Sequence, residues 1–191
     1  DGGQDLYILD LKSMTDKKIT DFKDRPMISY LAYNKTNNSL FFDITTHHFR
    51  DIYQYDLNKK ELIKAFEDSF YDERNYSSDF SGNEVFAKDQ SGIYNLFYRE
   101  NGSENGEYIT NVTGGAFMPD ISNDGKILFS LYEDGKYKIS LLENISKIDE
   151  KNVGYGKEYF LNNSNFSGPI TQLDTTKSSP YKDQFPNMFL M

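Results

Sequence analysis

The sequence predicts an all-β protein assembled from a repeated antiparallel unit, and three observations lead to this expectation. The 191 residues include 15 Tyr and 15 Phe but neither Trp nor Cys, and aromatic residues favour the half-buried surface of a pleated sheet. Short aromatic and aliphatic segments recur at intervals of 41 to 46 residues. Pairs of Asn, Asp, Ser and Gly precede many of these segments and tolerate the backbone angles of tight hairpin turns.

One set of segments occurs four times and has the pattern of a short strand with branched or aromatic residues. Its copies are residues 5–11, 51–57, 92–98 and 138–143. Alignment of the four copies places these residues at equivalent positions, 46, 41 and 46 residues apart: Leu6, Ile52, Ile93 and Ile139.

A second set of strand-like segments precedes the last three copies, and each begins after a turn signal. Phe42, Phe86 and Phe129 lie at equivalent positions in this set, 44 and 43 residues apart. We therefore expect them to be buried equivalently. The turn signals are Asn37-Asn38, Ser81-Gly82 and Asp124-Gly125.

Weaker strand segments flank these hairpins and complete a four-stranded unit. The expected first strands are residues 29–33, 75–79 and 118–122. The expected last strands are residues 18–21, 62–65 and 108–111, with Ile19, Ile63 and Ile109 aligned.

An antiparallel four-stranded unit of about 40 to 45 residues has the size of one β-propeller blade. The sequence therefore predicts a β-propeller of about 3.5 four-stranded blades. The half blade covers residues 5–22, and full blades cover residues 26–66, 74–112 and 117–161, the last with an outer strand at 158–161. The predicted domain boundaries are 1–161 for the blades and 162–191 for an irregular C-terminal tail or linker.

Residues 110–130 contain Thr110, Pro119, Asp124-Gly125 and Phe129 in an order that resembles the TolB-type (WD-repeat-like) propeller repeat. Residues 51–57 and 5–11 resemble the strand that follows in that repeat. The first two full blades depart from it, because Asn37-Asn38 and Ser81-Gly82 replace Asp-Gly and neither blade has a Pro equivalent to Pro119. The resemblance implies a complete propeller of about six blades, as in bacterial envelope proteins and prolyl-oligopeptidase-type enzymes.

Charge and composition restrict the function classes. A net charge of -9 repels phosphate backbones and argues against nucleic-acid binding. No apolar run approaches the roughly 20 residues that a membrane-spanning helix needs. The beginning of the chain at Asp1 resembles neither an initiator Met nor a signal peptide, so we expect a processed product or part of a longer chain.

The residues that carry chemistry predict no catalytic, cofactor or metal site. His47 and His48 are the only histidines, but adjacent strand residues point to opposite faces and rarely share one metal ion. No Gly-x-Ser-x-Gly motif is present. Carboxylate pairs such as Glu67-Asp68, Asp72-Glu73 and Glu133-Asp134 fall in expected loops, where charges are normally solvated.

Binding residues concentrate on loops, and the loops that connect the second and third strands share one face of a propeller with the loops between blades. This face would present aromatic and arginine side chains, which are common at interface hot spots. The predicted partner-binding residues are His47, His48, Phe49, Arg50, Phe70, Tyr71, Arg74 and Phe117.

The sequence therefore favours a non-catalytic protein-interaction module of a bacterial periplasmic or cell-envelope protein. One alternative is the regulatory propeller of a prolyl-oligopeptidase-like peptidase whose catalytic domain lies outside this chain. Another is a carbohydrate-binding propeller. Because each blade covers its faces with two neighbours, we also expect either self-association through open blade edges or further blades in a parent chain.

Overall fold

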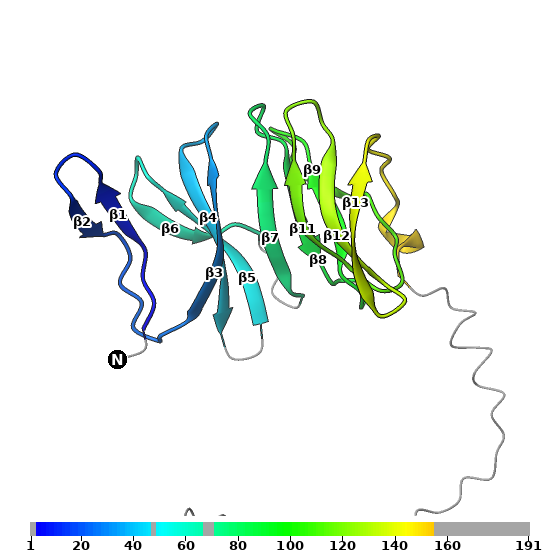
Figure 1. Ribbon diagram of the computed structural model, residues 1–191, viewed down its shortest axis with the longest axis horizontal. Coiled ribbons are helices and arrows are strands. Elements are labelled where there is room, and N and C mark those ends of the chain that lie inside the picture. Colours follow the sequence, from blue (N-terminus) through cyan, green and yellow to red (C-terminus); the bar gives the residue numbers. More distant parts are fainter. Residues whose placement is uncertain (1–2, 47–48, 67–70, 155–191) are drawn as a thin grey trace, which may run out of the picture. The chain divides into compact units, whose positions relative to one another are not determined.

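The computed structural model describes residues 3–46, 49–66 and 71–154, which form four antiparallel sheets stacked in chain order (Figure 1). A two-stranded sheet, here the half-blade, comes first and is followed by blade 1. Their strands are β1 (Tyr7–Asp10) and β2 (Thr15–Lys18) in the half-blade, and β3 (Met27–Asn34), β4 (Ser39–Thr46), β5 (Phe49–Asp56) and β6 (Glu61–Lys64) in blade 1.

Blade 2 repeats the four-stranded order of blade 1, and blade 3 has three strands among the described residues. The expected outer strand of blade 3 at residues 158–161 lies outside the described residues, as does the tail at 162–191. The strands are β7 (Glu73–Ser78), β8 (Glu84–Lys88), β9 (Asn95–Arg99) and β10 (Glu107–Tyr108) in blade 2, and β11 (Ala116–Ile121), β12 (Ile127–Glu133) and β13 (Lys136–Leu142) in blade 3.

The inner strand of each full blade contains the same irregularity, which the sequence did not predict. The pairing register of β3, β7 and β11 with the next strand shifts once in each blade. Tyr30, Asn75 and Met118 lie at these shifts with positive φ angles of 54°, 62° and 50°. Such a bulge inserts an extra residue and increases the local twist. The inner strands are therefore bent at equivalent points.

The core lies between consecutive sheets, as the repeat predicted. Phe42, Phe86 and Phe129 are all buried, and each side chain faces the preceding sheet. Phe42 packs in a cluster with Leu6 of the half-blade, while Phe86 packs in a cluster with Phe41 of blade 1. Phe129 joins the cluster between blades 2 and 3. The prediction of equivalent burial is confirmed.

The alignment of the third and fourth strands was wrong at two positions. Phe86 pairs with Phe97 as Phe42 pairs with Tyr53, so Leu96 is the equivalent of Ile52. Ile93 precedes β9 in a turn and is buried there without belonging to the strand. The fourth-strand alignment was wrong at Ile63. The backbone N–H that donates to the Ile52 carbonyl, at 2.9 Å, belongs to Ala65, so Ala65 is the equivalent of Ile19 and Ile109. Apolar residues near a strand end misled the alignment because residue type alone does not fix register.

The segment after β13 returns to the outer edge of blade 2. Ile148 forms a bridge with Tyr108 on β10, and its N–H donates to the Tyr108 carbonyl at 2.8 Å. The short 3₁₀ helix η1 (Glu150–Asn152) follows, and the Asn111 side chain donates to the Asn152 carbonyl at 2.8 Å. This segment covers an edge strand that would otherwise expose unpaired backbone groups.

Candidate functional site

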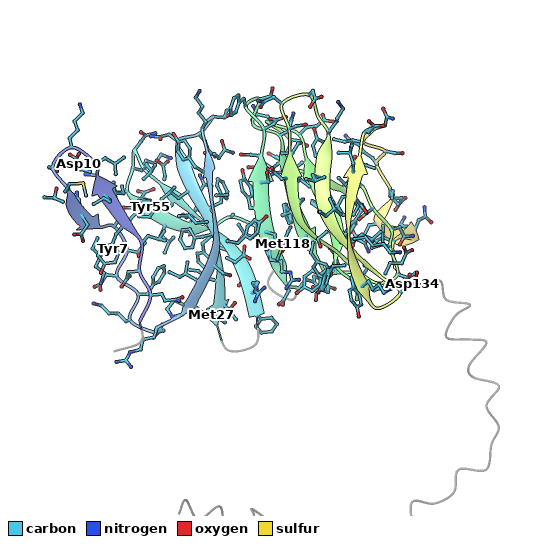
Figure 2. The ribbon with its side chains drawn as sticks, in the orientation of Figure 1. Tyr7, Asp10, Met27, Tyr55, Met118 and Asp134 are labelled. Atoms are coloured by element: carbon cyan, nitrogen blue, oxygen red, sulfur yellow. The ribbon has the colours of Figure 1, made fainter. Side chains whose placement is uncertain are left out.

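The predicted binding face is the one formed by the β4–β5, β8–β9 and β12–β13 loops and the connections between blades. Figure 2 shows Asp134 at the β12–β13 turn on this face. Three of the predicted residues, His47, His48 and Phe70, lie outside the described residues. Phe49 is exposed at the start of β5, and Tyr71 is half-buried shortly before β7. The remaining three, Arg50, Arg74 and Phe117, belong to a connected cluster.

Arg74 lies at the centre of this cluster. Its guanidinium carbon is 4.2 Å from the ring centroid of Tyr94 in blade 2 and 4.6 Å from that of Phe117 in blade 3. Stacking on aromatic faces fixes the plane of a guanidinium. The Arg74 Nε is buried without a hydrogen-bond partner among the described residues. Arg74 is therefore held mainly by packing.

Asp72 connects Arg50 to the same cluster. One of its carboxylate oxygens accepts the backbone N–H of Arg50 at 3.0 Å, and the other accepts the Tyr94 hydroxyl at 2.9 Å. The Asp72 N–H donates to the Asp89 carboxylate at 2.8 Å. These bonds tie the start of β5 to the β8–β9 turn, so the loops of blades 1 and 2 are held in a fixed arrangement.

Burial changes the acid–base properties of this cluster. Desolvation, followed by the hydrogen bond to Asp72, raises the pKa of the Tyr94 hydroxyl above its ordinary value. Desolvation also raises the pKa of Asp89, with the Asp72 charge contributing in the same direction. Tyr94 therefore remains a neutral hydroxyl donor at physiological pH.

Two glycines allow the aromatic part of the cluster to pack closely. A Cβ at Gly114 would lie 2.0 Å from the Tyr132 carbonyl oxygen, and one at Gly115 would lie 2.5 Å from the Phe117 ring. Gly115 also has a φ of 133°, which side chains other than glycine rarely adopt. The Gly114-Gly115 pair thus lets the chain entering blade 3 pass directly against these rings.

The aromatic cluster continues to the surface of blade 3. The rings of Phe117 and Tyr137 are 6.2 Å apart, and those of Tyr137 and Tyr132 are 5.0 Å apart. Tyr132 and Tyr137 are opposite each other on β12 and β13 and are exposed. We call Arg50, Asp72, Arg74, Tyr94, Phe117, Tyr132 and Tyr137 the loop-face cluster.

Sequence analysis found three members of the loop-face cluster and missed four. Tyr94 and the two exposed tyrosines belong to a residue type that the hot-spot argument would have included. Their loops were recognised, but nothing in the sequence showed that these rings would meet Arg74 or Phe117. Asp72 was considered only as part of a solvated carboxylate pair, whereas the structure gives both of its oxygens partners.

Within the loop-face cluster, the Asp72 carboxylate accepts the Tyr94 hydroxyl, and the seven residues include no serine. No group of three or more potential His, Cys, Asp or Glu metal ligands occurs among residues 3–46, 49–66 and 71–154. In the same ranges, no helix has the length and apolar character needed to cross a membrane.

A polar cleft of about 420 Å³ opens elsewhere, between the β3–β4 turn of blade 1 and blade 2. Glu84 and Arg99 line it, but the Glu84 carboxylate already accepts hydrogen bonds from the Tyr76 hydroxyl at 2.7 Å and the Arg99 Nε at 2.7 Å. The Glu84 carboxylate is therefore committed to hydrogen bonds within blade 2.

Stacked antiparallel four-stranded sheets with a common inner-strand bulge define this chain as a β-propeller protein. No family model matches the chain, and no curated protein matches it. Among solved structures, the chain is similar to TolB from Acinetobacter baumannii, with a TM-score of 0.62 and 22% identity over 75% of this chain. It is also similar to a putative TolB from Agrobacterium tumefaciens, with a TM-score of 0.61 and 18% identity over 74% of this chain.

These likenesses show that the blades have a TolB-like propeller fold, as the repeat predicted. The matched region spans 36% of the Acinetobacter protein and 53% of the Agrobacterium protein. For this chain, the activity and partners of a whole TolB-like protein can therefore only be proposed.

Proposed function

We propose that this chain is a non-catalytic protein-interaction module and that its partner binds the loop-face cluster. The observation that carries the proposal is the Arg74 guanidinium packed against the rings of both Tyr94 and Phe117, continuous with the exposed rings of Tyr132 and Tyr137. Tyr and Arg are the residue types most enriched at interface hot spots. Rigid rings also lose little conformational entropy on binding.

The arrangement of the cluster supports binding in a second way. Hydrogen bonds from Arg50 and Tyr94 to Asp72 connect loops from two blades before any partner is present. Preorganisation of this kind lowers the entropic cost of association. We further propose a periplasmic or cell-envelope location in a bacterium, which the TolB-type resemblance supports.

The two alternative functions have weaker support. Of the acidic side chains that line the polar cleft, Glu84 is already hydrogen-bonded to Tyr76 and Arg99, so it gives no specific reason to favour carbohydrate binding there. The regulatory propeller of a peptidase would share the same fold, and a binding face would not distinguish it. The gene sequence on either side of this chain would distinguish this alternative, because it would show whether a peptidase catalytic domain is present.

A capture experiment with matched variants tests the proposal. The immobilised chain is incubated with a bacterial envelope extract, and retained proteins are compared for wild type, Arg74→Ala, Tyr137→Ala and Phe80→Ala. Phe80 is an exposed aromatic residue on the β7–β8 turn, at the opposite end of blade 2 from Arg74. Hot-spot truncation typically costs about 2 kcal/mol or more, roughly thirtyfold in affinity.

We expect one protein to be retained by wild type and Phe80→Ala and to be lost from both cluster variants. Urea unfolding of each variant establishes that it is folded. Retention of the same proteins by all four chains would contradict the proposal.

A further inference from the structure

The hairpin that connects β9 and β10 contains two Asn-Gly pairs, Asn101-Gly102 and Asn105-Gly106. In such a pair the backbone nitrogen of the glycine can attack the side-chain carbonyl carbon of the asparagine, because glycine has no Cβ to obstruct the approach. Asparagine is therefore a chemically labile residue. The two pairs are alike in sequence, so only their surroundings can make their reactivity differ.

Asn101 is fixed by hydrogen bonds to the β7–β8 turn. Its side-chain amide donates to the Ser81 carbonyl at 2.7 Å, and its backbone N–H donates to the Asn83 side chain at 3.1 Å. The Asn101 Cγ also lies against Gly82, where an added Cβ would be 3.0 Å away. The amide must therefore give up its bond to Ser81 before its carbonyl carbon can rotate freely.

Asn105 is exposed, and its side chain has no such restraint. Only its backbone is bonded, because the Asn105 N–H donates to the Ser103 hydroxyl at 3.3 Å and the Asn105 carbonyl accepts that hydroxyl at 2.6 Å. Neither the Asn105 side-chain amide nor the Gly106 N–H has a hydrogen-bond partner among residues 3–46, 49–66 and 71–154. Both reacting groups are therefore available, in adjacent residues of one loop.

Gly106 itself lies in a crowded place. An added Cβ would collide with the Phe97 ring and lie 2.7 Å from the Tyr98 carbonyl oxygen. The packing against β9 therefore requires a glycine directly after Asn105. Glu107, the next residue, pairs with Tyr98 at the start of β10, so any change of backbone length in this loop is passed on to β10.

Contacts at the outer edge of blade 2 depend on the position of β10. The Ile148 N–H donates to the Tyr108 carbonyl at 2.8 Å, and Lys147 forms an ion pair with Glu107 at 3.2 Å. Because Gly106 has no free space beside it, a longer backbone before Gly106 must displace Glu107 and disturb these contacts.

We propose that Asn105 is a site of spontaneous deamidation and that its isoaspartyl product loosens the outer edge of blade 2. The Gly106 nitrogen bonds to the Asn105 Cγ, and the side-chain nitrogen leaves with the Gly106 proton as ammonia. The reaction is intramolecular, which favours it strongly over attack by a separate molecule. The inference is independent of the proposed partner-binding function.

Water then opens the cyclic imide that this step forms. Attack at the former side-chain carbonyl breaks the new bond to Gly106 and leaves an ordinary aspartate. Attack at the backbone carbonyl breaks the original peptide bond and leaves isoaspartate, in which the main chain passes through the side chain and is one carbon longer. Only isoaspartate changes the length of the backbone.

Peptide mapping by mass spectrometry gives the first test. The folded full-length chain is incubated in mildly alkaline buffer, and replacement of –NH2 by –OH adds about 1 Da to the peptide, whose fragmentation identifies the asparagine. We expect Asn105 to react about five to ten times faster than Asn101, the ratio that one net hydrogen bond to Ser81 would produce.

Two controls separate the fold from the sequence. In urea the two asparagines should react at similar rates, because the bond from Asn101 to Ser81 is lost. In the folded Asn105→Gln variant the fast reaction should disappear, because glutamine would have to form a larger ring.

Hydrogen exchange tests the structural consequence. The isoaspartyl form of the aged chain is separated by chromatography and compared with wild type and with Asn105→Asp, which carries the same added charge on a backbone of normal length. The Ile148 amide should exchange about tenfold faster in the isoaspartyl chain, as expected for the loss of about one hydrogen bond at this edge. Asn105→Asp should exchange like wild type.

Three results would overturn the inference. Equal rates at Asn101 and Asn105 in the folded chain would show that the bond to Ser81 gives no protection. A folded chain that stays unmodified at Asn105, under conditions in which the chain in urea reacts there, would show that the loop prevents the attack. Wild-type exchange at Ile148 in the isoaspartyl chain would show that β10 accommodates the longer backbone.

Discussion

The carboxylate of Asp43 on β4 accepts the backbone N–H of Asn75 on β7 through both oxygens, at 3.1 and 3.3 Å. This contact crosses the boundary between blade 1 and blade 2. Asn75 is the bulge residue of its strand, so Asp43 provides a partner for an N–H that leaves the regular ladder. Asp43 is almost completely buried, and desolvation raises its pKa from 3.8 to about 7.

Substitution Asp43→Asn should therefore change the pH dependence of stability. Between about pH 4 and pH 7 the folded protein holds a proton that the unfolded chain has released, so the wild-type free energy of unfolding falls as pH rises through this window. Each unit of pKa difference corresponds to about 1.4 kcal/mol. The wild-type free energy of unfolding should therefore fall by on the order of 2 to 4 kcal/mol across this window. Asp43→Asn keeps an acceptor for the Asn75 N–H but has no carboxyl group to titrate, so this fall should be absent in the variant.

Urea unfolding at pH 5 and pH 8 measures this effect. The control is Asp16→Asn, which removes an exposed carboxylate on β2. This control should keep the wild-type pH dependence of stability. If Asp43→Asn and wild type lost the same stability between the two pH values, Asp43 would not be the titrating group.

Phe86→Ala tests the interblade core. The Phe86 ring is 1% exposed, stacks on Phe66 at 4.2 Å and makes a tilted contact with Phe97 at 5.3 Å. Truncation of a buried Phe costs about 3 to 5 kcal/mol through lost contacts and the remaining cavity. Chemical denaturation should show this loss, whereas the exposed Phe80→Ala should change stability by less than about 0.5 kcal/mol. A cost below about 1 kcal/mol for Phe86→Ala would mean that the repeat register is wrong.

Thr110→Val tests a hydrogen-bonded clamp that recurs between the third and fourth strands. The Thr110 hydroxyl accepts the Leu96 N–H at 2.8 Å and donates to the Asn95 side chain at 3.0 Å. Valine preserves the shape but leaves the buried N–H unpaired, which costs about 1 to 3 kcal/mol. The free energy of unfolding should fall by this amount.

The half-blade offers a matched comparison for this clamp. Thr20 accepts the Leu6 N–H at 2.8 Å and donates to Asp5 at 3.0 Å, so Thr20→Val removes the equivalent bonds in a two-stranded sheet. We expect a smaller loss there, because Leu6 and Asp5, the partners of Thr20, are only partly buried and water can replace the bonds. Equal losses would show that burial does not determine the cost of breaking the clamp.

Most of the fold could be predicted from the sequence because sheet formation depends on local patterns. Phe42, Phe86 and Phe129 recur at nearly constant spacing, and the turn residues before them allow tight hairpins. Register was less predictable. Ile93 and Ile63 matched the apolar pattern, yet Leu96 and Ala65 occupy the equivalent positions, because strand pairing and not residue type sets the alignment.

The proposed binding site could be predicted only in part. Arg50, Arg74 and Phe117 were recognised from residue type and expected loop position, while Tyr94 was missed because its partner Asp72 is 22 residues away in sequence. Contacts between loops of different blades depend on how the sheets stack, which no local pattern encodes.

The sequence by itself determined the all-β class, the four-stranded unit and the aromatic core between sheets, because alternation and turn chemistry act over a few residues. Only the tertiary structure decided that Tyr30, Asn75 and Met118 form bulges, that Arg74 packs on rings from two blades, and that Ile139 is open while Ile52 is covered. These features depend on the packing of one sheet on the next, where residues distant in sequence compete for the same space.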